Sequence, residues 1–147
     1  MLKSMSNETS KVRLLSVADM DRMLPLALQL GEYKEDQIRT YINEMFTYTN
    51  YVCFGFFVSD ELIGLTSGWT TTRFYCGKQL EIDNVVIDAA YQSKGYGRIF
   101  ESEIKEWCSK RDYDTIELNS YVFNSRSHKF YFNQDYKIIG YHFQKKL

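Results

Sequence analysis

The chain has 147 residues, 44% of them hydrophobic and 16% aromatic, which is enough for one domain with its own core. Its 18 lysines and arginines nearly balance its 19 aspartates and glutamates, so no global field favours nucleic acid or an anionic membrane. No apolar run is long enough to cross a bilayer, and the first eleven residues lack the apolar core of a signal peptide. We therefore expect one cytoplasmic domain spanning residues 1–147, with residues 1–11 frayed.

The candidate soft metal ligands are three cysteines and two histidines: Cys53, Cys76, Cys108, His128 and His142. Because their spacing contains no C-x-x-C pair, we expect no metal site. Cys53 falls in an aromatic strand segment and Cys108 on the apolar stripe of a helix, which predicts buried, unreactive thiols. A cysteine nucleophile paired with His128 is the alternative.

The first predicted element is a short strand over residues 12–17. We expect Asp19 to cap a helix that runs to about Leu30 and is kinked or interrupted by Pro25. Apolar residues at helical spacing predict a second helix: Ile38, Ile42, Met45 and Phe46.

Two apolar runs rich in β-forming residues, 51–59 and 62–70, are separated by Asp-Glu and predict a hairpin. The remaining predicted elements are a strand at 80–87, a helix beginning at residue 97 or 98, a strand at 115–122, a short helix at 125–134 and a closing strand at 137–147. This order predicts an α+β fold, with a mixed, mostly antiparallel sheet, a central parallel β-α-β pair and helices on both faces.

In the predicted strand 80–87, alternation places Leu80, Ile82 and Val86 on one face, while Glu81 and Asp83 share the other. Two glycines, at positions 95 and 97, then separate this strand from the next helix. Glycine at such a junction permits a positive φ or a close approach of another group to the backbone. Unpaired N–H groups there, added to the helix N-terminus, favour a phosphate. Ordinary loop glycines are the alternative, and neither a P-loop nor a complete dinucleotide fingerprint is present.

The stretch Gln92–Gly97 (QSKGYG) resembles the Q/R-x-x-G-x-G/A signature of the GNAT superfamily of N-acyltransferases. Asn124, Ser127, Phe130 and Tyr131 similarly fall on the family's N-x-x-A-x-x-F-Y pattern, and the predicted topology also matches. The departures are Ala89 where proline is frequent, Ser93 where glycine is common, Ser127 for alanine, and Asp135 for a glycine after the last helix. Asp135 is therefore expected in the left-handed conformation, which aspartate tolerates.

The resemblance implies an N-acetyltransferase that carries acetyl from acetyl-CoA, its co-substrate, to a primary amine of a small molecule by direct attack in a ternary complex. We expect a monomer or homodimer, and the balanced charge predicts neither nucleic acid nor a membrane as a partner. The residues that the resemblance assigns to acetyl-CoA binding are Val85, Val86, Ile87, Gln92, Ser93, Lys94, Gly95, Tyr96, Gly97, Arg98, Asn124 and Tyr131.

For catalysis, the resemblance assigns Tyr131 as the acid that protonates the leaving thiolate, although a tyrosine among other aromatic residues can also simply pack. Glu81, eleven residues before Gln92, matches the position of a family base; Asp83 or an ordered water is the alternative. Either carboxylate can equally be a solvated strand residue or a ligand for the positive charge of the amine. Asn124 would contact pantetheine, or else cap the following helix. The aromatic residues proposed to line the acceptor pocket are Tyr33, Trp69, Phe74 and Tyr75.

Two other functions stay open. One is a protein acetyltransferase that acts on a lysine or an N-terminus, because the acceptor site falls in the variable first helices. The other is a non-catalytic acyl-CoA-binding sensor, which would need neither Tyr131 nor Glu81.

Overall fold

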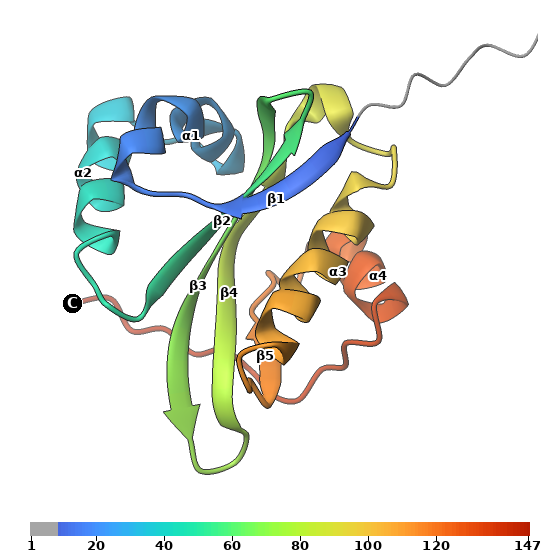
Figure 1. The fold of residues 1–147 in the computed structure, drawn as a ribbon. Helices are drawn as coiled ribbons and strands as arrows, with labels where there is room; N and C mark the ends of the chain where they lie inside the picture. Colours follow the sequence, from blue (N-terminus) through green and yellow to red (C-terminus); the bar gives the residue numbers. More distant parts are fainter. Residues whose placement is uncertain (1–8) are drawn as a thin grey trace, which may run out of the picture. The chain divides into compact units, whose positions relative to one another are not determined.

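The computed structural model describes residues 9–147, which fall into two compact units divided after residue 117. Unit 1 holds a sheet with the strand order β1-β2-β3-β4-β5 (Figure 1). The strands are β1 Ser10–Leu14, β2 Tyr51–Val58, β3 Glu61–Arg73, β4 Gly77–Ile87 and β5 Thr115–Leu118. β1 to β4 pair antiparallel, and β4 and β5 form a parallel pair joined through a helix. The predicted mixed α+β sheet is confirmed.

Four α-helices and three short 3-10 turns complete the regular structure of residues 9–147. The helices are α1 Met20–Ala27, α2 Glu35–Met45, α3 Tyr96–Ser109 and α4 Ser125–Asn133, and the 3-10 turns are Val17–Asp19, Leu28–Leu30 and Ala89–Tyr91. Within this described part, no helix is long and apolar enough to cross a membrane.

The start of the first helix differs from the expectation. Ser16, and not Asp19, caps the opening turn: its Oγ accepts from the N–H of Ala18, and Asp19 Oδ2 accepts from the N–H of Ser16. This reciprocal pair is a capping box. A hydrogen bond from Arg13 holds the pKa of Asp19 below its usual range. Pro25 lies inside α1, which continues to Ala27 before it tightens into a 3-10 turn.

The β2–β3 hairpin turns at Ser59 and Asp60, one residue earlier than predicted. Both have positive φ, 49° and 65°, as the favoured two-residue turn between twisted strands requires. At the N-terminus, Ser10 and Lys11 already pair with β2, so the predicted frayed segment is too long by these residues. Residues 1–8 of that segment lie outside the described residues.

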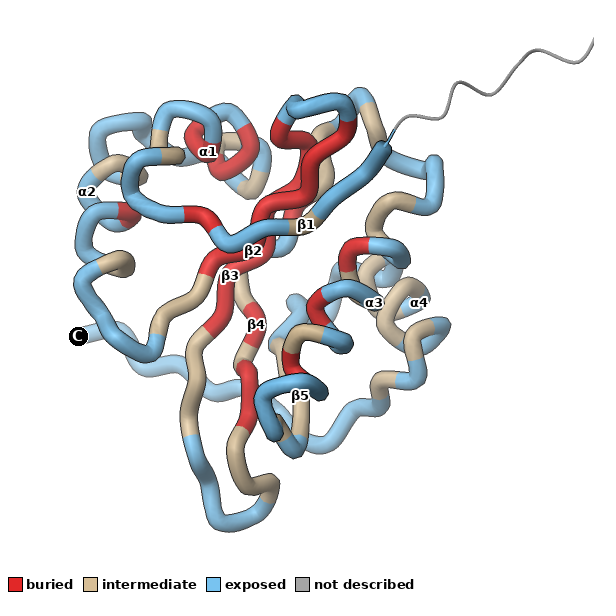
Figure 2. Tube along the Cα trace, in the orientation of Figure 1, coloured by how far each residue is buried: buried red, intermediate tan, exposed pale blue. Residues whose placement is uncertain are grey.

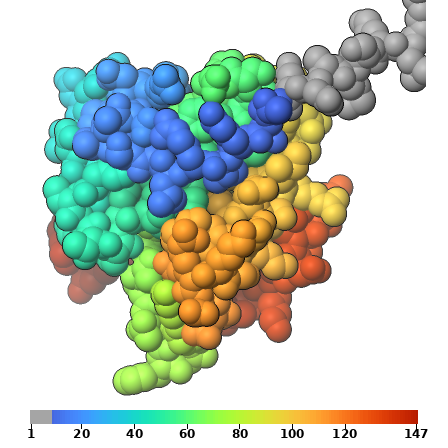
Figure 3. All heavy atoms as spheres, in the orientation of Figure 1, coloured from blue at the N-terminus to red at the C-terminus, as the bar shows by residue number. Residues whose placement is uncertain are grey.

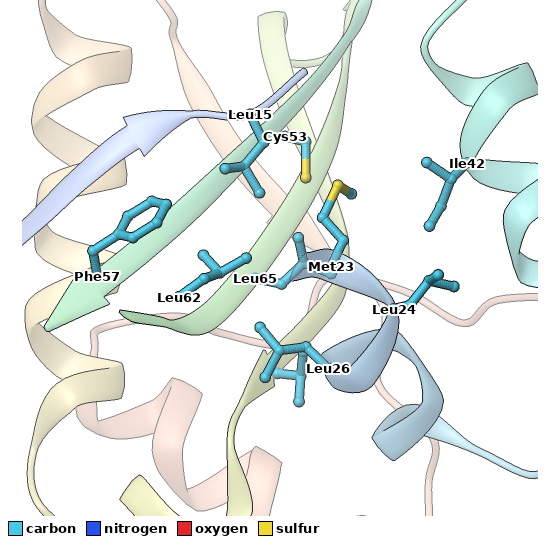
Figure 4. Close-up of a cluster of buried hydrophobic side chains, with 10 residues drawn as sticks. Leu15, Met23, Leu24, Leu26, Ile42, Cys53, Phe57, Leu62 and Leu65 are labelled. Atoms are coloured by element: carbon cyan, nitrogen blue, oxygen red, sulfur yellow. The ribbon is translucent and has the colours of Figure 1, made fainter. Parts of the chain in front are cut away.

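Both faces of the sheet in unit 1 are covered by helices, and the buried residues run along its central strands (Figure 2). α1 and α2 cover one face, where Met23 and Ile42 pack in a core with Cys53 (Figure 4). α3 covers the other face, where Phe56 lies 5.4 Å from Phe100 between ring centroids. Cys53 and Cys108 are buried, as predicted, and burial raises their pKa values to about 12 and about 11.

A β-bulge in β4 overturns one face assignment. Leu65 pairs with Val86 but Ser67 pairs with Asp83, so β4 carries one extra residue opposite β3, and Asn84 takes a φ of 49°. The extra residue inverts the alternation. Val86 therefore packs in the core under α1 and not on the face of Leu80 and Ile82.

Unit 2, residues 118–147, contains α4, and the predicted short helix is confirmed. Asp135 has a φ of 64°, also as predicted. The predicted closing strand is wrong: residues 137–147 have no regular secondary structure, and Ile139, Tyr141 and Phe143 are exposed. An alternating segment becomes a strand only when a neighbour satisfies its backbone hydrogen bonds, and no described strand pairs with this one. β5 likewise ends at Leu118, earlier than expected.

Candidate functional site

The loop after β4 is held by two glutamine side chains, one from the loop itself and one from a distant part of unit 1. Gln92 Nε2 donates to the carbonyl of Ile87, at 2.9 Å. Gln29, from the end of the first helical segment, accepts from the N–H of Ala89 at 3.0 Å and donates to Asp88 at 3.3 Å. Sequence reasoning missed Gln29, because no local pattern connects residues about sixty positions apart.

Gly95, the N-cap residue of α3, takes the left-handed conformation, with a φ of 83°. It offers no side-chain cap to the first-turn N–H groups, and a Cβ built on it would meet no atom within 4 Å. The backbone there is open to an incoming group, and uncapped N–H groups at a helix N-terminus attract an anion. Gly97, in contrast, lies inside the first turn of α3 without a positive φ. This geometry fits the expected pyrophosphate of acetyl-CoA.

A stripe of polar side chains lies on one face of β3 and β4. Directly opposed residues share a face, and the register pairs polar residues with each other. We call the following residues the polar stripe: Ser67, Trp69, Thr71, Gln79, Glu81 and Asp83. The prediction that Glu81 and Asp83 share a face is confirmed. The stripe is on the face that α1 covers, and it continues along the hairpin that projects from unit 1 (Figure 3).

Glu81 lies in an ion pair: Arg73 Nη2 is 3.0 Å from Glu81 Oε2. The fully buried Gln79 amide, oriented to satisfy both its polar atoms, accepts from Arg73 Nε at 3.1 Å and donates to Glu117 at 2.8 Å. The hydroxyl of Tyr75 also donates to Glu117, at 2.6 Å, and this bond raises the pKa of Tyr75 to about 12. Sequence reasoning missed Arg73, Gln79 and Glu117, because the network spans three strands.

Asp83 has different partners. Trp69 Nε1 donates to its Oδ2 at 2.8 Å, Asn84 Nδ2 donates to its Oδ1 at 3.2 Å, and the Ser67 hydroxyl also donates to Oδ1. All three donors are neutral. The carboxylate is thus fixed in orientation by the strand opposite it and by the bulge.

Unit 2 places the remaining predicted residues. Asn124 caps α4, with its Oδ1 accepting from the N–H of Ser127 at 3.1 Å, so the capping alternative is confirmed. The ring of Tyr131 is half-buried and packs edge-on against Phe130, at 5.3 Å, and Tyr136, at 5.4 Å. This packing fixes the direction in which the Tyr131 side chain leaves α4.

Of the predicted acceptor aromatic residues, Trp69 belongs to the polar stripe and Tyr75 to the Glu117 network. Phe74 is fully exposed in the β3–β4 turn, and Tyr33 lies against Gly31. The structure therefore brings only part of the predicted set close to Glu81.

The other features of the described residues do not extend this site. Among residues 9–147, no group of three His, Cys, Asp or Glu side chains could hold a metal ion. An open hollow of about 310 Å³ lies between β1 and α3 on the other face of the sheet, and none of the predicted site residues lines it. Its charged residues include Glu106 and Lys110, which form an ion pair with each other.

The chain is similar to known proteins in both sequence and structure. The model of the acetyltransferase (GNAT) family matches residues 19–135. The structure is similar to a possible acetyltransferase from Clostridium difficile 630, at a TM-score of 0.82 and 17% identity over 95% of this chain and 98% of that one. It is also similar to an aminoglycoside N-acetyltransferase in complex with CoA, at a TM-score of 0.81 and 10% identity over 96% of each chain.

A third similar structure is the ribosomal-protein-alanine N-acetyltransferase from Brucella melitensis biovar Abortus 2308, at a TM-score of 0.80 and 14% identity over 95% of this chain and 99% of that one. No curated protein matches the sequence. At these identities, the structural likeness concerns the fold.

Proposed function

The chain belongs to the GNAT acetyltransferase family, and from this premise we propose that it is an N-acetyltransferase, acting on a primary amine of a small molecule. Acetyl transfer would occur from acetyl-CoA by direct attack in a ternary complex. The observation that carries this proposal is the open, left-handed Gly95 at the junction of β4 and α3, with uncapped N–H groups beside it.

The residues proposed to hold acetyl-CoA come from three segments. The loop and first turn, residues 92–98, would bind the pyrophosphate through backbone N–H groups. The backbone of residues 85–87 would pair with the pantetheine amides as an added strand does. Asn124 would contact the same arm in addition to capping α4. When bound, acetyl-CoA supplies the acetyl group and a thiolate as leaving group.

Two protein side chains would move the protons. Glu81 would take a proton from the amine, because an alkylamine is mostly protonated at neutral pH and must lose a proton to attack. Arg73, whose Nη2 lies 3.0 Å from Glu81 Oε2, would hold this carboxylate in position. Tyr131 would give a proton to the sulfur, and the N–H of Val86 would stabilise the developing oxyanion.

A protein acceptor is the second candidate, favoured by the similarity to the ribosomal-protein-alanine N-acetyltransferase. A non-catalytic acyl-CoA sensor would make no use of Glu81 or Tyr131. We further propose that residues 1–147 form one domain, located in the cytoplasm as a monomer or homodimer; the balanced charge and the family match across both units support this.

A thermal scan followed by a turnover assay tests the proposal. Acetyl-CoA should raise the melting temperature, by about 2.7 kcal/mol of stabilisation at 100 times Kd, and NADH or ATP should do far less. CoA release should then be measured across a panel of small amines and peptides with a free N-terminus or lysine. No thermal shift at saturating acetyl-CoA would contradict the cofactor assignment, and release with peptides alone would select the protein acceptor.

A further inference from the structure

The two carboxylates of the polar stripe differ in whether their charge is neutralised. Glu81 is paired with the guanidinium of Arg73. Asp83 receives hydrogen bonds from a hydroxyl, an indole and an amide, and within residues 9–147 no Lys or Arg nitrogen lies within 4.0 Å of it. Neutral donors fix the orientation of a carboxylate but leave its net charge in place. Asp83 is therefore the uncompensated anion of the stripe.

This charge lies at the edge of a buried core, where it is poorly screened. Asp83 is half-buried, and its partner Ser67 is only 1% exposed. Burial raises the pKa values of Tyr51 and Cys53, and the negative charge of Asp83 raises both further. A half-buried anion without a counter-ion costs free energy in the free protein. A cation that reached Asp83 would recover part of this cost.

Aromatic rings stand next to the same carboxylate. Trp69, which donates to Asp83, is half-buried, and its ring lies 4.9 Å from that of Tyr51 and 5.6 Å from that of Tyr48 between centroids. Tyr48 is about half exposed, so the cluster reaches the surface. The faces of aromatic rings attract ammonium groups, and this attraction adds to the electrostatic attraction of a carboxylate.

We propose that Asp83 binds the ammonium group of the acceptor, with the Trp69 ring beside it, so that the acceptor is an amine that is cationic at neutral pH. This inference rests on the proposed function and deepens it. Asp83 selects the charged amine in the ground state. Glu81, two residues along the strand at a spacing of about 7 Å, keeps its role as the base.

The test exploits the two tryptophans of the chain, Trp69 and Trp107. The indole N–H signals of 15N-labelled protein, saturated with CoA, are followed during titration at neutral pH with benzylamine, which is cationic, and with benzyl alcohol, its neutral counterpart. We expect benzylamine to shift the Trp69 signal saturably and to leave Trp107, on the other face of the sheet, unchanged. Benzyl alcohol should bind at least ~10-fold more weakly, about 1.4 kcal/mol.

Two variants sharpen the measurement. Asp83→Asn should weaken benzylamine binding at least 10-fold and leave benzyl alcohol binding unchanged. Glu106→Gln, which removes one negative charge from the ion pair with Lys110 on α3, should change neither. The comparison of the two ligands on the wild-type chain needs no variant, so it decides the proposal even if Asp83→Asn fails to fold.

Equal affinities for benzylamine and benzyl alcohol, or no saturable shift of the Trp69 signal, would overturn the proposal. A turnover assay with the best acceptor adds a second criterion: Asp83→Asn should raise KM at least 10-fold while kcat stays within about 3-fold. An active enzyme with an unchanged KM would refute the inference and leave the proposed function intact. If the chain binds benzylamine saturably but transfers no acetyl group, the proposed function is refuted and ammonium binding at Asp83 stands.

Discussion

Arg73 on β3 and Glu81 on β4 form an ion pair, with Nη2 and Oε2 3.0 Å apart, although the strand register pairs Arg73 with Gly77 and Glu81 with Trp69. Both side chains remain partly exposed, 48% and 30%, so the ion pair contributes at most about 1 kcal/mol to the free energy of unfolding. A substitution at Glu81 therefore reports on chemistry more than on folding.

Glu81→Gln should lower kcat/KM for an alkylamine by roughly 10²-fold or more, the usual contribution of a general base. The difference in kcat/KM between wild type and variant should decrease as pH rises, because a larger fraction of the amine is then neutral and needs no base to remove its proton. Steady-state rates between pH 7 and 9 measure this, with Glu106→Gln as the charge-matched control. If Glu81→Gln is as fast as wild type at every pH, Glu81 is not the base, and water or Asp83 takes that role.

Tyr131→Phe should lower kcat by roughly 10²-fold, because the thiolate would leave without an acid, while acetyl-CoA affinity stays nearly constant. Single-turnover kinetics isolate the chemical step if product release is slow. Tyr136→Phe is the matched control, since it removes a hydroxyl from the ring that packs against Tyr131. If both variants turn over like wild type, Tyr131 serves only to pack unit 2.

Gly95→Ala should weaken acetyl-CoA binding at least ~10-fold, about 1.4 kcal/mol, because the added Cβ enters the open space beside the uncapped N–H groups. The left-handed φ should also cost about 1 kcal/mol of stability. Calorimetric titration and urea denaturation separate the two effects.

Gly77→Ala provides the control for this test. Gly77 also has a positive φ, 73°, but its Cβ would collide with the carboxylate of Asp114 at the other end of β4. The Gly77→Ala variant should therefore be less stable than wild type and should keep its affinity for acetyl-CoA. Wild-type affinity in well-folded Gly95→Ala would refute a cofactor cradle at this loop.

The buried thiols predict a loss of stability at alkaline pH. The pKa of Cys53 is raised from its usual 9.0 to about 12 by burial, so the native state keeps a proton that the unfolded chain loses above pH 9. The free energy of unfolding should therefore fall as pH rises from 9 towards 12, by up to about 1.4 kcal/mol per pH unit. Below pH 9 this contribution is fully present.

Urea denaturation between pH 8 and 11 measures this slope. Cys53→Ala should lower stability at pH 8, because it leaves a cavity, but should flatten the alkaline slope. Cys76→Ala, at a half-exposed position, should leave the slope as it is in wild type. An unchanged slope in Cys53→Ala would show that other groups cause the alkaline loss.

The sequence by itself determined the features that depend on neighbouring residues. The glycine loop before α3, the short helix with Asn124 at its cap, and the left-handed Asp135 follow from local backbone requirements. The common face of Glu81 and Asp83 follows from strand alternation before the bulge.

Tertiary structure decided what depends on partners far along the chain. The bulge at Asn84 moved Val86 to the other face, because one extra residue against β3 cannot be seen within β4 alone. Residues 137–147 have the alternation of a strand, yet they form none, because no described strand pairs with them. Glu81 and Asp83 are both acidic residues of one predicted strand, and the sequence alone does not distinguish them. The fold brings Arg73 of β3 within 3.0 Å of Glu81, whereas Asp83 receives hydrogen bonds from neutral donors.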